Sequence, residues 1–353
     1  MKTIELGDGE VLLGDLVDAL DRISIIGGGA PLPVVTDARL ASLHGAKLAP
    51  VTLQPPIVIP EGEGAKDWPT LAAIIDGLGQ RNVRRGTPII ALGGGSVGDV
   101  TGLAASLYKR GCPVIHVPTT LLAQADSAIG GKTAIDAAGQ KNLVGTFHMP
   151  ALVVADPSFL DTLDPRQFLS GYAEVVKYGL IDDPDFLAWC EVHGAALIAG
   201  DREARLRAVA YCIRAKARFV AADPLDTNGQ RALLNLGHSF GHAIEAVAGI
   251  GRLLHGEAVA IGLVLAFRLS AMLGHCPEDD VSRVVDHLAS VGLPTRLDQV
   301  GLAGSSEAIL DRLGNDKKAT STGPALILVR GIGRAYLDDA VPRAALESFI
   351  RSL

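Results

Sequence analysis

The sequence predicts an α/β N-terminal domain with a doubly wound, Rossmann-like sheet, followed by a mainly α-helical C-terminal domain. In the first half, short and almost continuously apolar runs alternate with helical patterns. Such runs are typical of parallel strands that are buried on both faces. From about residue 165 long helical patterns dominate instead. We therefore divide the chain into residues 1–155 and 156–353, and we expect a ligand site in the crevice between the two domains.

Five apolar runs that end in Gly, Pro or Asp are predicted to be the parallel strands. They span residues 33–37, 55–60, 87–95, 113–118 and 151–156. Helical patterns lie between them at about 66–79 and 97–109, and six more follow at 165–180, 184–198, 201–222, 231–248, 256–273 and 278–291. A strand-like pair in residues 324–337 interrupts the helices near the end.

Composition places the chain among soluble globular proteins. Of its 353 residues, 48% are hydrophobic and only 4% aromatic, so its cores must be aliphatic. The net charge of −7 and the absence of a basic run argue against nucleic acid as a partner. Four widely spaced cysteines indicate neither a disulfide framework nor a thiolate zinc site. Because no signal region or membrane-spanning run is evident, we expect a cytoplasmic protein that does not bind a membrane.

A glycine-rich turn follows the third predicted strand. In "IIALGGGSVGDVTG" (residues 89–102), Gly93, Gly94 and Gly95 would let the backbone approach a pyrophosphate, and the amide groups that start the next helix would bind it. The segment is not a G-x-G-x-x-G motif, and an ordinary tight turn is the alternative. Asp99 in the first helical turn either stabilises the helix dipole or contacts a ligand.

Two further loops suggest an anion site. Thr119 and Thr120 follow a predicted strand in "VPTTLLAQADSAIGGKTAID" (residues 117–136), where a flexible "GGK" loop presents Lys132. Lys141 and Asn142 repeat the combination of glycine with a cation in "GQKNLVG". Capping threonines and solvated lysines are the alternative interpretation, but two such loops so close together favour an anion.

The helical pattern at 231–248 contains "ALLNLGHSFGHAIEA". At about 100° per residue, one narrow face of a continuous helix carries Arg231, Asn235, His238 and His242, opposite an apolar face. Core histidines and a solvated face are the alternatives. Solvated faces usually carry Lys and Glu, which are absent here before Glu245. We therefore predict a functional face.

A carboxylate and a third histidine complete a candidate metal site. Glu174 and Lys177 share a helix face in "GYAEVVKYGL", and His255 precedes the apolar helix in "LLHGEAVAIG". One Glu with two His leaves positions open for water or substrate, as in catalytic zinc sites. Spacing alone leaves open which of His238, His242 and His255 bind the metal. The absence of the Glu of H-E-x-x-H from "HSFGH" excludes a zinc protease.

An acidic protein must gather its cations locally to bind a polyanionic substrate. Each lysine taken alone is more simply explained as a surface residue. The candidates for such a cluster are Lys132, Lys177, Lys216, Arg231, Lys317 and Lys318.

These motifs together resemble the 3-dehydroquinate synthase family. The resemblance covers about residues 30–335 and rests on "ALGGGSVGDVTG", "VPTTLLAQADSAIGGKTAI", "GYAEVVKYGLI", "RALLNLGHSFGHAIEA" and "LHGEAVAIGLVLA", in the family's order. One segment departs from the pattern. "DPLDTNGQR" is one residue longer than the usual D-E-x-E-x-G stretch and has Asp226 where a Glu is usual.

The resemblance implies a dehydroquinate synthase-like fold and a phosphate-eliminating carbon–oxygen lyase of the shikimate pathway. Members convert 3-deoxy-D-arabino-heptulosonate 7-phosphate, a small sugar phosphate, to 3-dehydroquinate and phosphate. They use NAD and a divalent metal, usually zinc, with cobalt or another ion as the alternative. A substrate hydroxyl is oxidised, phosphate is eliminated, hydride returns, and an intramolecular aldol step closes the ring. A homodimer is also implied.

The resemblance implies a role for each motif residue. The metal ligands would be Glu174, His238 and His255, so His242 becomes a substrate-site residue. NAD would contact Asp37, Glu63, Lys66, Gly94, Gly95, Ser96, Val97, Gly98, Asp99, Thr119, Thr120, Lys132, Lys141, Asn142 and Thr162. The substrate phosphate would be held by Lys132, Asn142, Asn235, His242 and Lys317 or Lys318, the carboxylate by Lys216 and Arg231, and the ring hydroxyls by Asp126 and Lys177. Arg110 would reach the partner's site across a dimer interface.

Three other functions compete with this one. Cyclases such as 2-deoxy-scyllo-inosose synthase share NAD and a metal but act on substrates without a carboxylate, whereas Lys216 and Arg231 together favour a carboxylate. Metal-dependent glycerol or alcohol dehydrogenases would accumulate NADH. A regulatory protein that only binds NAD would not need an open metal site.

Overall fold

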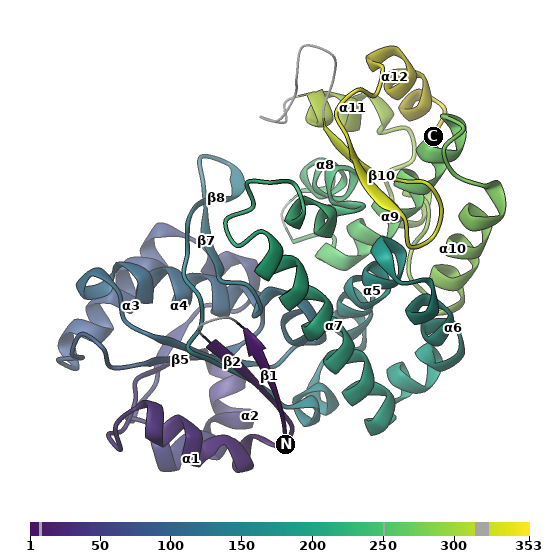
Figure 1. Ribbon diagram of the computed structural model, residues 1–353. Coiled ribbons are helices and arrows are strands. Elements are labelled where there is room, and N and C mark those ends of the chain that lie inside the picture. The colour runs from purple at the N-terminus through teal and green to yellow at the C-terminus, as the bar shows by residue number, and fades with distance from the viewer. Residues whose placement is uncertain (7–8, 250, 315–324) are drawn as a thin grey trace. The chain divides into compact units, whose positions relative to one another are not determined.

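The computed structural model describes residues 1–6, 9–249, 251–314 and 325–353, which form two compact units (Figure 1). The first unit comprises Met1–Leu163 and Arg205–Ala221, and the second comprises Asp164–Ala204 and Ala222–Leu353. Helix α7 (Arg202–Ala222) therefore gives most of its length to the first unit, although it lies among the helical patterns of the second half of the sequence.

A seven-stranded sheet forms the centre of the first unit. Its strands are β1 (Lys2–Leu6), β2 (Gly9–Leu13), β3 (Val34–Asp37), β4 (Ile57–Ile59), β5 (Ile89–Gly93), β6 (Val114–Pro118) and β9 (Leu152–Ala155), in the order β1-β2-β9-β6-β5-β3-β4. Strands β1 and β2 pair antiparallel, and the other neighbours pair parallel. The five apolar runs are thus confirmed as the parallel strands β3, β4, β5, β6 and β9, while the β1–β2 pair was not predicted.

Helices cover both faces of this sheet, as a doubly wound fold requires. Along β5, Ile89 packs into one core and Ile90 into the opposite core, because successive side chains of a strand point to opposite faces. Figure 1 shows α1 and α2 on one side of the sheet and α3 and α4 on the other. These helices are α1 (Leu16–Ile26), α2 (Ala38–Leu48), α3 (Trp68–Gln80) and α4 (Gly95–Leu107). The predicted α/β class and aliphatic cores are confirmed.

The direction of winding reverses between β3 and β5. The chain leaves β3 for β4 on one side and leaves β5 for β6 on the other. Ligands of doubly wound folds bind outside the carboxyl ends of the strands at such a reversal. Asp37 ends β3 and Gly93 ends β5, so Asp37 and the glycine-rich turn both lie at the carboxyl ends of these strands.

The prediction that flexible loops present Lys132 and Lys141 is wrong, because both residues belong to an antiparallel hairpin. It consists of β7 (Lys132–Ala137) and β8 (Gln140–Phe147). The connecting residues Ala138 and Gly139 have φ values of 50° and 70°. Two positive φ values are what a tight two-residue hairpin turn demands.

The second unit is mainly helical, as predicted. Its helices are α5 (Pro165–Asp182), α6 (Pro184–Ala199), α8 (His238–Ala248), α9 (His255–Met272), α10 (Glu278–Ser290), α11 (Ser306–Gly314) and α12 (Arg343–Arg351). The strand-like pair is confirmed as the antiparallel hairpin of β10 (Leu326–Val329) and β11 (Ala335–Asp338). Helix α9 is long and apolar enough to cross a membrane, but most of it is buried inside this unit, as in the core helix of a globular protein.

The continuous helix predicted at 231–248 is wrong. Residues Arg231–Asn235 form a short 3₁₀ helix, and the chain turns at Gly237, whose φ of 80° is left-handed. Helix α8 begins only at His238. Arg231 and Asn235 therefore do not share a helix with the two histidines. The prediction of one polar helix face for all four residues is wrong.

Candidate active site

Three side chains of the second unit converge on one point. Glu174 lies in the middle of α5, whereas His238 and His255 are the first residues of α8 and α9. Glu174 Oε1 lies 3.4 Å from His238 Nε2 and 3.3 Å from His255 Nε2. On the same face of α5, as predicted, Lys177 Nζ lies 2.6 Å from Glu174 Oε2.

Close packing of the helices brings these residues together. A Cβ on Gly256 would lie 1.9 Å from the carbonyl oxygen of Ser170, so glycine allows α9 to approach α5. The Gly256 N–H donates to Ser170 Oγ at 2.9 Å, which ties the start of α9 to α5. A Cβ on Gly237, just before α8, would lie 2.8 Å from the backbone nitrogen of Leu263. Glycines thus set how closely both histidine-bearing helix ends approach their neighbours.

The buried carboxylate of Glu174 is kept ionised by its neighbours. Glu174 and Lys177 are 0% and 1% exposed. Burial disfavours the carboxylate, but Lys177 and the ring of His238 hold the pKa of Glu174 well below its usual value. Burial lowers the pKa of His238, so this ring is neutral and offers a lone pair. Burial also opposes protonation of His255, but its contacts with Glu174 and Glu245 raise its pKa to about 9.

The donor set suits a divalent cation. In a tetrahedral site with bonds of about 2.1 Å, ligand atoms lie about 3.4 Å apart. The carboxylate–histidine distances are 3.3 and 3.4 Å. Both Glu174 oxygens are buried, and neither accepts a hydrogen bond of regular geometry from the described residues, although charged and ring groups lie within ion-pair range. A cation compensates such a buried anion, so Glu174, His238 and His255 fit a zinc or cobalt ion.

His242 is set apart from this group. It lies one turn after His238 on α8 but is exposed. Its ring centre is 5.5 Å from that of His238 and 5.9 Å from that of His255. His242, Glu245 and His255 form a second group whose potential ligand atoms lie within 4.8 Å of one another.

A compact loop around Asp223 holds Arg231. The Asp223 carboxylate accepts hydrogen bonds from the backbone N–H groups of Thr227, Asn228 and Arg231, at 2.8, 3.2 and 3.3 Å. Burial works against the carboxylate, but these bonds outweigh it and lower the pKa of Asp223. Arg231 is 2% exposed, and its guanidinium donates to Pro224 O at 2.9 Å. The segment that departs from the family pattern is therefore an ordered support for Arg231.

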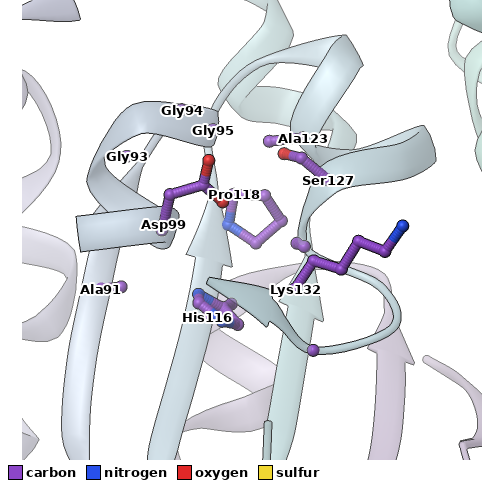
Figure 2. Close-up of a pocket in the computed structure, with 13 residues that line it drawn as sticks. Ala91, Gly93, Gly94, Gly95, Asp99, His116, Pro118, Ala123, Ser127 and Lys132 are labelled. Atoms are coloured by element: carbon purple, nitrogen blue, oxygen red, sulfur yellow. The ribbon is translucent and has the colours of Figure 1, made fainter. Parts of the chain in front are cut away.

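In the first unit, the glycine-rich turn packs closely against its neighbours and leaves the start of α4 without a side-chain cap. Gly94, the N-cap of α4, provides no side-chain cap, so no capping side chain occupies the first amide groups of this helix. A Cβ on Gly94 would lie 3.0 Å from Thr120 Cγ2, and one on Gly95 would lie 3.0 Å from Ser127 Oγ. Figure 2 shows Asp99 and Ser127 beside this turn. Ser127 Oγ is buried and has no hydrogen-bond partner among the described residues, and the whole turn fits the pyrophosphate of a dinucleotide.

Five predicted cofactor residues form a connected polar cluster beside this turn. Lys66 Nζ donates to Asp99 Oδ2 at 2.8 Å and to Asn142 Oδ1, and lies 3.6 Å from Glu63 Oε1. Ser96 Oγ donates to Glu63 Oε2 at 3.0 Å. Burial disfavours the charged ammonium, but Asp99 and Glu63 outweigh it and raise the pKa of Lys66. Burial raises the pKa of Asp99, against the pull of Lys66.

Two predicted substrate residues of the first unit also meet. Lys216 Nζ on α7 lies 2.6 Å from Asp126 Oδ1 and donates to Asp126 O at 2.7 Å. Other predicted residues have local partners: Asp37 accepts from Leu40 N and caps α2, Thr162 Oγ1 lies 3.0 Å from His44 Nε2, Thr120 Oγ1 accepts from Ala123 N, Thr119 N donates to Gly93 O, and Lys141 Nζ lies 3.8 Å from Glu63 Oε1.

Other predicted residues lie at the ends of elements or outside the described chain. Lys132 is exposed at the start of β7. Arg110 is exposed in the turn after α4 and has a φ of 64°. Asn235 ends the short helix that begins at Arg231. Lys317 and Lys318 fall outside the described residues.

Two supporting residues were missed by sequence reasoning. Glu245 contacts His255 Nδ1 at 3.2 Å, and Asp223 folds the loop before Arg231. The available signals were the acidic side chain three residues after His242 in an otherwise apolar helix, and the Asp that opens the longer segment.

Family comparisons cover most of the chain. The model described as 3-dehydroquinate synthase N-terminal matches residues 56–170, and the one described as 3-dehydroquinate synthase C-terminal matches residues 171–319. The curated 3-dehydroquinate synthase of Zymomonas mobilis is 49% identical over 84% of this chain and 78% of its own length. That of Ruegeria pomeroyi is 44% identical over 98% of this chain and 97% of its own length.

Solved structures share the fold over the whole chain. The 2-epi-5-epi-valiolone synthase of Streptomyces hygroscopicus, with NAD+ and Zn2+ bound, superposes with a TM-score of 0.89 at 30% identity and covers 100% of this chain and 98% of its own. A 2-deoxy-scyllo-inosose synthase complexed with carbaglucose-6-phosphate, NAD+ and Co2+ gives 0.88 at 26% identity, with 99% of both chains covered. The butanol dehydrogenase of Thermotoga maritima, at 14% identity, shares the fold alone, with a TM-score of 0.70 over 99% of this chain and 98% of its own.

Proposed function

Because this chain belongs to the 3-dehydroquinate synthase family, we propose that it is an enzyme that converts 3-deoxy-D-arabino-heptulosonate 7-phosphate to 3-dehydroquinate and phosphate. The observation that carries the proposal is the group of Glu174, His238 and His255 beside Lys177, in a chain that is 44–49% identical to curated members. A protein that only bound NAD would not need this buried donor set.

We propose NAD and a zinc or cobalt ion as the cofactors, as in the two solved cyclases. When bound, they would supply reversible hydride transfer and polarise the substrate hydroxyl. Glu174, His238 and His255 would hold the ion. The first turn of α4 would bind the pyrophosphate, and the cluster around Lys66 would orient the rest of the dinucleotide.

The remaining motif side chains are assigned to the substrate. We assign a ring hydroxyl to Lys177, and its ion pair with Glu174 supports a defined position for the ammonium. Asp126 is assigned the same role. Cations and amides that stabilise the departing phosphate act by position and charge and need no covalent step. We assign the phosphate to Lys132, Asn142, Asn235, His242 and either Lys317 or Lys318.

The substrate carboxylate distinguishes this reaction from that of the solved inosose synthase, whose bound carbaglucose-6-phosphate has no carboxylate. Arg231 supports the assignment, because its guanidinium is buried and fixed by Pro224 O, and a fixed guanidinium fork suits a carboxylate. Lys216 is assigned the second cationic contact. Its ion pair with Asp126 supports a defined position for the ammonium.

We further propose that the enzyme is a cytoplasmic homodimer. Arg110 and its neighbour Lys109 both have positive φ values, a backbone conformation that is uncommon for residues other than glycine. Leu107, Phe147 and Met149 are exposed at 49%, 47% and 37%, and a second copy that covered them would bury apolar area. Light scattering after gel filtration should give twice the chain mass.

Phosphate release tests the proposal. The purified chain with NAD and zinc should release phosphate from the heptulosonate phosphate, chelation should stop the release, and added zinc should restore it. Glucose 6-phosphate, which has no carboxylate, is the control substrate and should be turned over far more slowly. A metal-replete, NAD-loaded preparation that releases no phosphate, or that prefers glucose 6-phosphate, would contradict the proposal.

A further inference from the structure

We propose that Glu245 is a positioning residue that fixes the ring of His255 so that Nε2 faces Glu174 and the bound cation. The inference rests on the metal centre of the proposed function. It adds a supporting carboxylate to that centre. The two histidine ligands are then oriented by different partners, one by a carboxylate and one by a backbone carbonyl.

The His255 ring is held on both of its nitrogen edges. Nδ1 lies 3.2 Å from Glu245 Oε2, and Nε2 lies 3.3 Å from Glu174 Oε1. Cation binding requires the neutral form of His255, and a neutral imidazole has one N–H donor and one lone pair. When Nδ1 donates to Glu245, the lone pair is at Nε2, the atom that faces Glu174 and the proposed cation site. Histidine ligands of metals commonly donate their other ring N–H to a carboxylate in this way.

The ring of His238 is oriented by a backbone carbonyl instead of a carboxylate. His238 Nδ1 lies 3.2 Å from the backbone carbonyl oxygen of Leu236, so its Nε2 likewise faces Glu174. The His238 side chain is 11% exposed and is held by packing, whereas that of His255 is 31% exposed at the first residue of α9. The more exposed of the two rings is the one that contacts a supporting carboxylate.

Glu245 is suited to this task by its own surroundings. It is 8% exposed on α8, two turns after His238, so one helix supplies a metal ligand directly and supports another. A buried carboxylate with a defined partner holds a ring more firmly than an exposed one, because solvent competes less for its hydrogen bonds.

A second cation is the competing explanation for the same residues. Glu245 and His255, together with His242, could in principle surround an ion. Two observations favour a supporting role. The Glu245–His255 contact has the geometry of a hydrogen bond, whereas neither Glu174 oxygen accepts a regular one from the described residues. His242 is also exposed, unlike the ligands of the first group.

Zinc binding without substrate tests the inference independently of activity. Chelator competition should show one zinc per chain and, in Glu245→Ala, an affinity about 10- to 100-fold weaker. Glu245→Gln keeps the shape and a hydrogen-bond acceptor, so it should fold normally and lose less affinity than Glu245→Ala. Glu191→Gln removes a carboxylate from the same unit, one that pairs with Arg283 far along the sequence from both histidines, and should bind zinc like the parent.

Cobalt substitution gives a second measurement that mere loss of stability would not reproduce. The visible spectrum of bound cobalt reports its ligand geometry, and we expect it to change in Glu245→Ala while Glu191→Gln keeps the parent spectrum. Unchanged zinc affinity and cobalt spectrum in Glu245→Ala would overturn the inference and leave the proposed function standing. Two zinc ions per parent chain, with one lost in Glu245→Ala, would also overturn it, because Glu245 would then be a ligand. A failure of the proposed function would instead appear in the phosphate assay of the parent enzyme.

Discussion

His238 and His242 lie one turn apart on α8, but their surroundings differ sharply. The ring of His238 is buried against Glu174, whereas His242 is exposed. We expect His238→Ala to weaken zinc binding by about 100-fold or more, because a direct ligand should matter at least as much as a supporting residue. His242→Ala should keep its zinc and lose about 100-fold in phosphate release. Metal analysis with a rate assay checks both, and equal zinc loss in the two variants would contradict the division of roles.

Asp223 offers a second test at the scale of single residues. Asp223→Asn removes the charge that gathers three backbone N–H groups and thereby supports Arg231. Loss of these charge-assisted hydrogen bonds should let the Arg231 loop move, so we expect the KM for substrate to rise about tenfold or more. Zinc content should not change. Asp298→Asn, which affects only an exposed pair with Arg296, is the control, and an unchanged KM in Asp223→Asn would exclude the supporting role.

Which residues could be predicted from sequence depended on whether their motif carried the chemistry itself. Glu174, Lys177, His238 and His255 were candidates by their residue types, but spacing left the three histidines undecided, and only the family resemblance selected His238 and His255. The structure brings these four side chains together. Glu245 was missed because a supporting carboxylate is distinguished only by the contact it makes, here across ten residues of chain.

Among the elements, α5 and α9 owe their approach to one glycine. Gly256→Ala would place a methyl group 1.9 Å from Ser170 O, so the helices must separate and carry Glu174 away from His255. We expect a lower thermal midpoint and zinc binding weakened about tenfold or more. In Gly79→Ala the new methyl group meets nothing within 4 Å on α3, so this control should bind zinc normally and gain about 0.5–1 kcal/mol in stability. Normal zinc affinity in Gly256→Ala would refute the packing explanation.

Elements were predictable where local pattern and tertiary environment agreed. Strands β3, β5, β6 and β9 are buried at every position, and β4 is buried at Ile57 and Ile59, so their apolar runs were unambiguous. The prediction of one helix across 231–248 was wrong because helical periodicity assumes a continuous helix. Gly237 interrupts it with a left-handed φ where the backbone packs against α9. The hairpin of β7 and β8 was missed because β8 is largely exposed and carries no apolar alternation strong enough to outweigh its Gly and Lys residues.

At the scale of the whole molecule, buried histidines should make stability depend on pH. His116 is 6% exposed on β6, and burial lowers its pKa from 6.5 to about 4. As pH falls from 6.5 to 4, the unfolded chain binds a proton at this residue while the folded chain does not. Stability present above pH 6.5 is therefore lost through this window, by about 3 kcal/mol at most for this residue.

We expect His116→Gln to reduce the drop in thermal midpoint between pH 7 and pH 4.5. Part of the drop should remain, because burial also lowers the pKa of His44, His238 and His287. His193→Gln on the surface of α6 is the control and should follow the parent curve. Parallel curves for His116→Gln and the parent would contradict the prediction.

The membership of this chain in the synthase family predicts that NAD is used and returned within each turnover. The most direct measurement follows phosphate and NADH together in one reaction of the heptulosonate phosphate with the zinc- and NAD-loaded enzyme. We predict many equivalents of phosphate per enzyme with no net accumulation of NADH. NADH rising in step with substrate consumption, without phosphate release, would contradict the synthase assignment and identify a dehydrogenase instead.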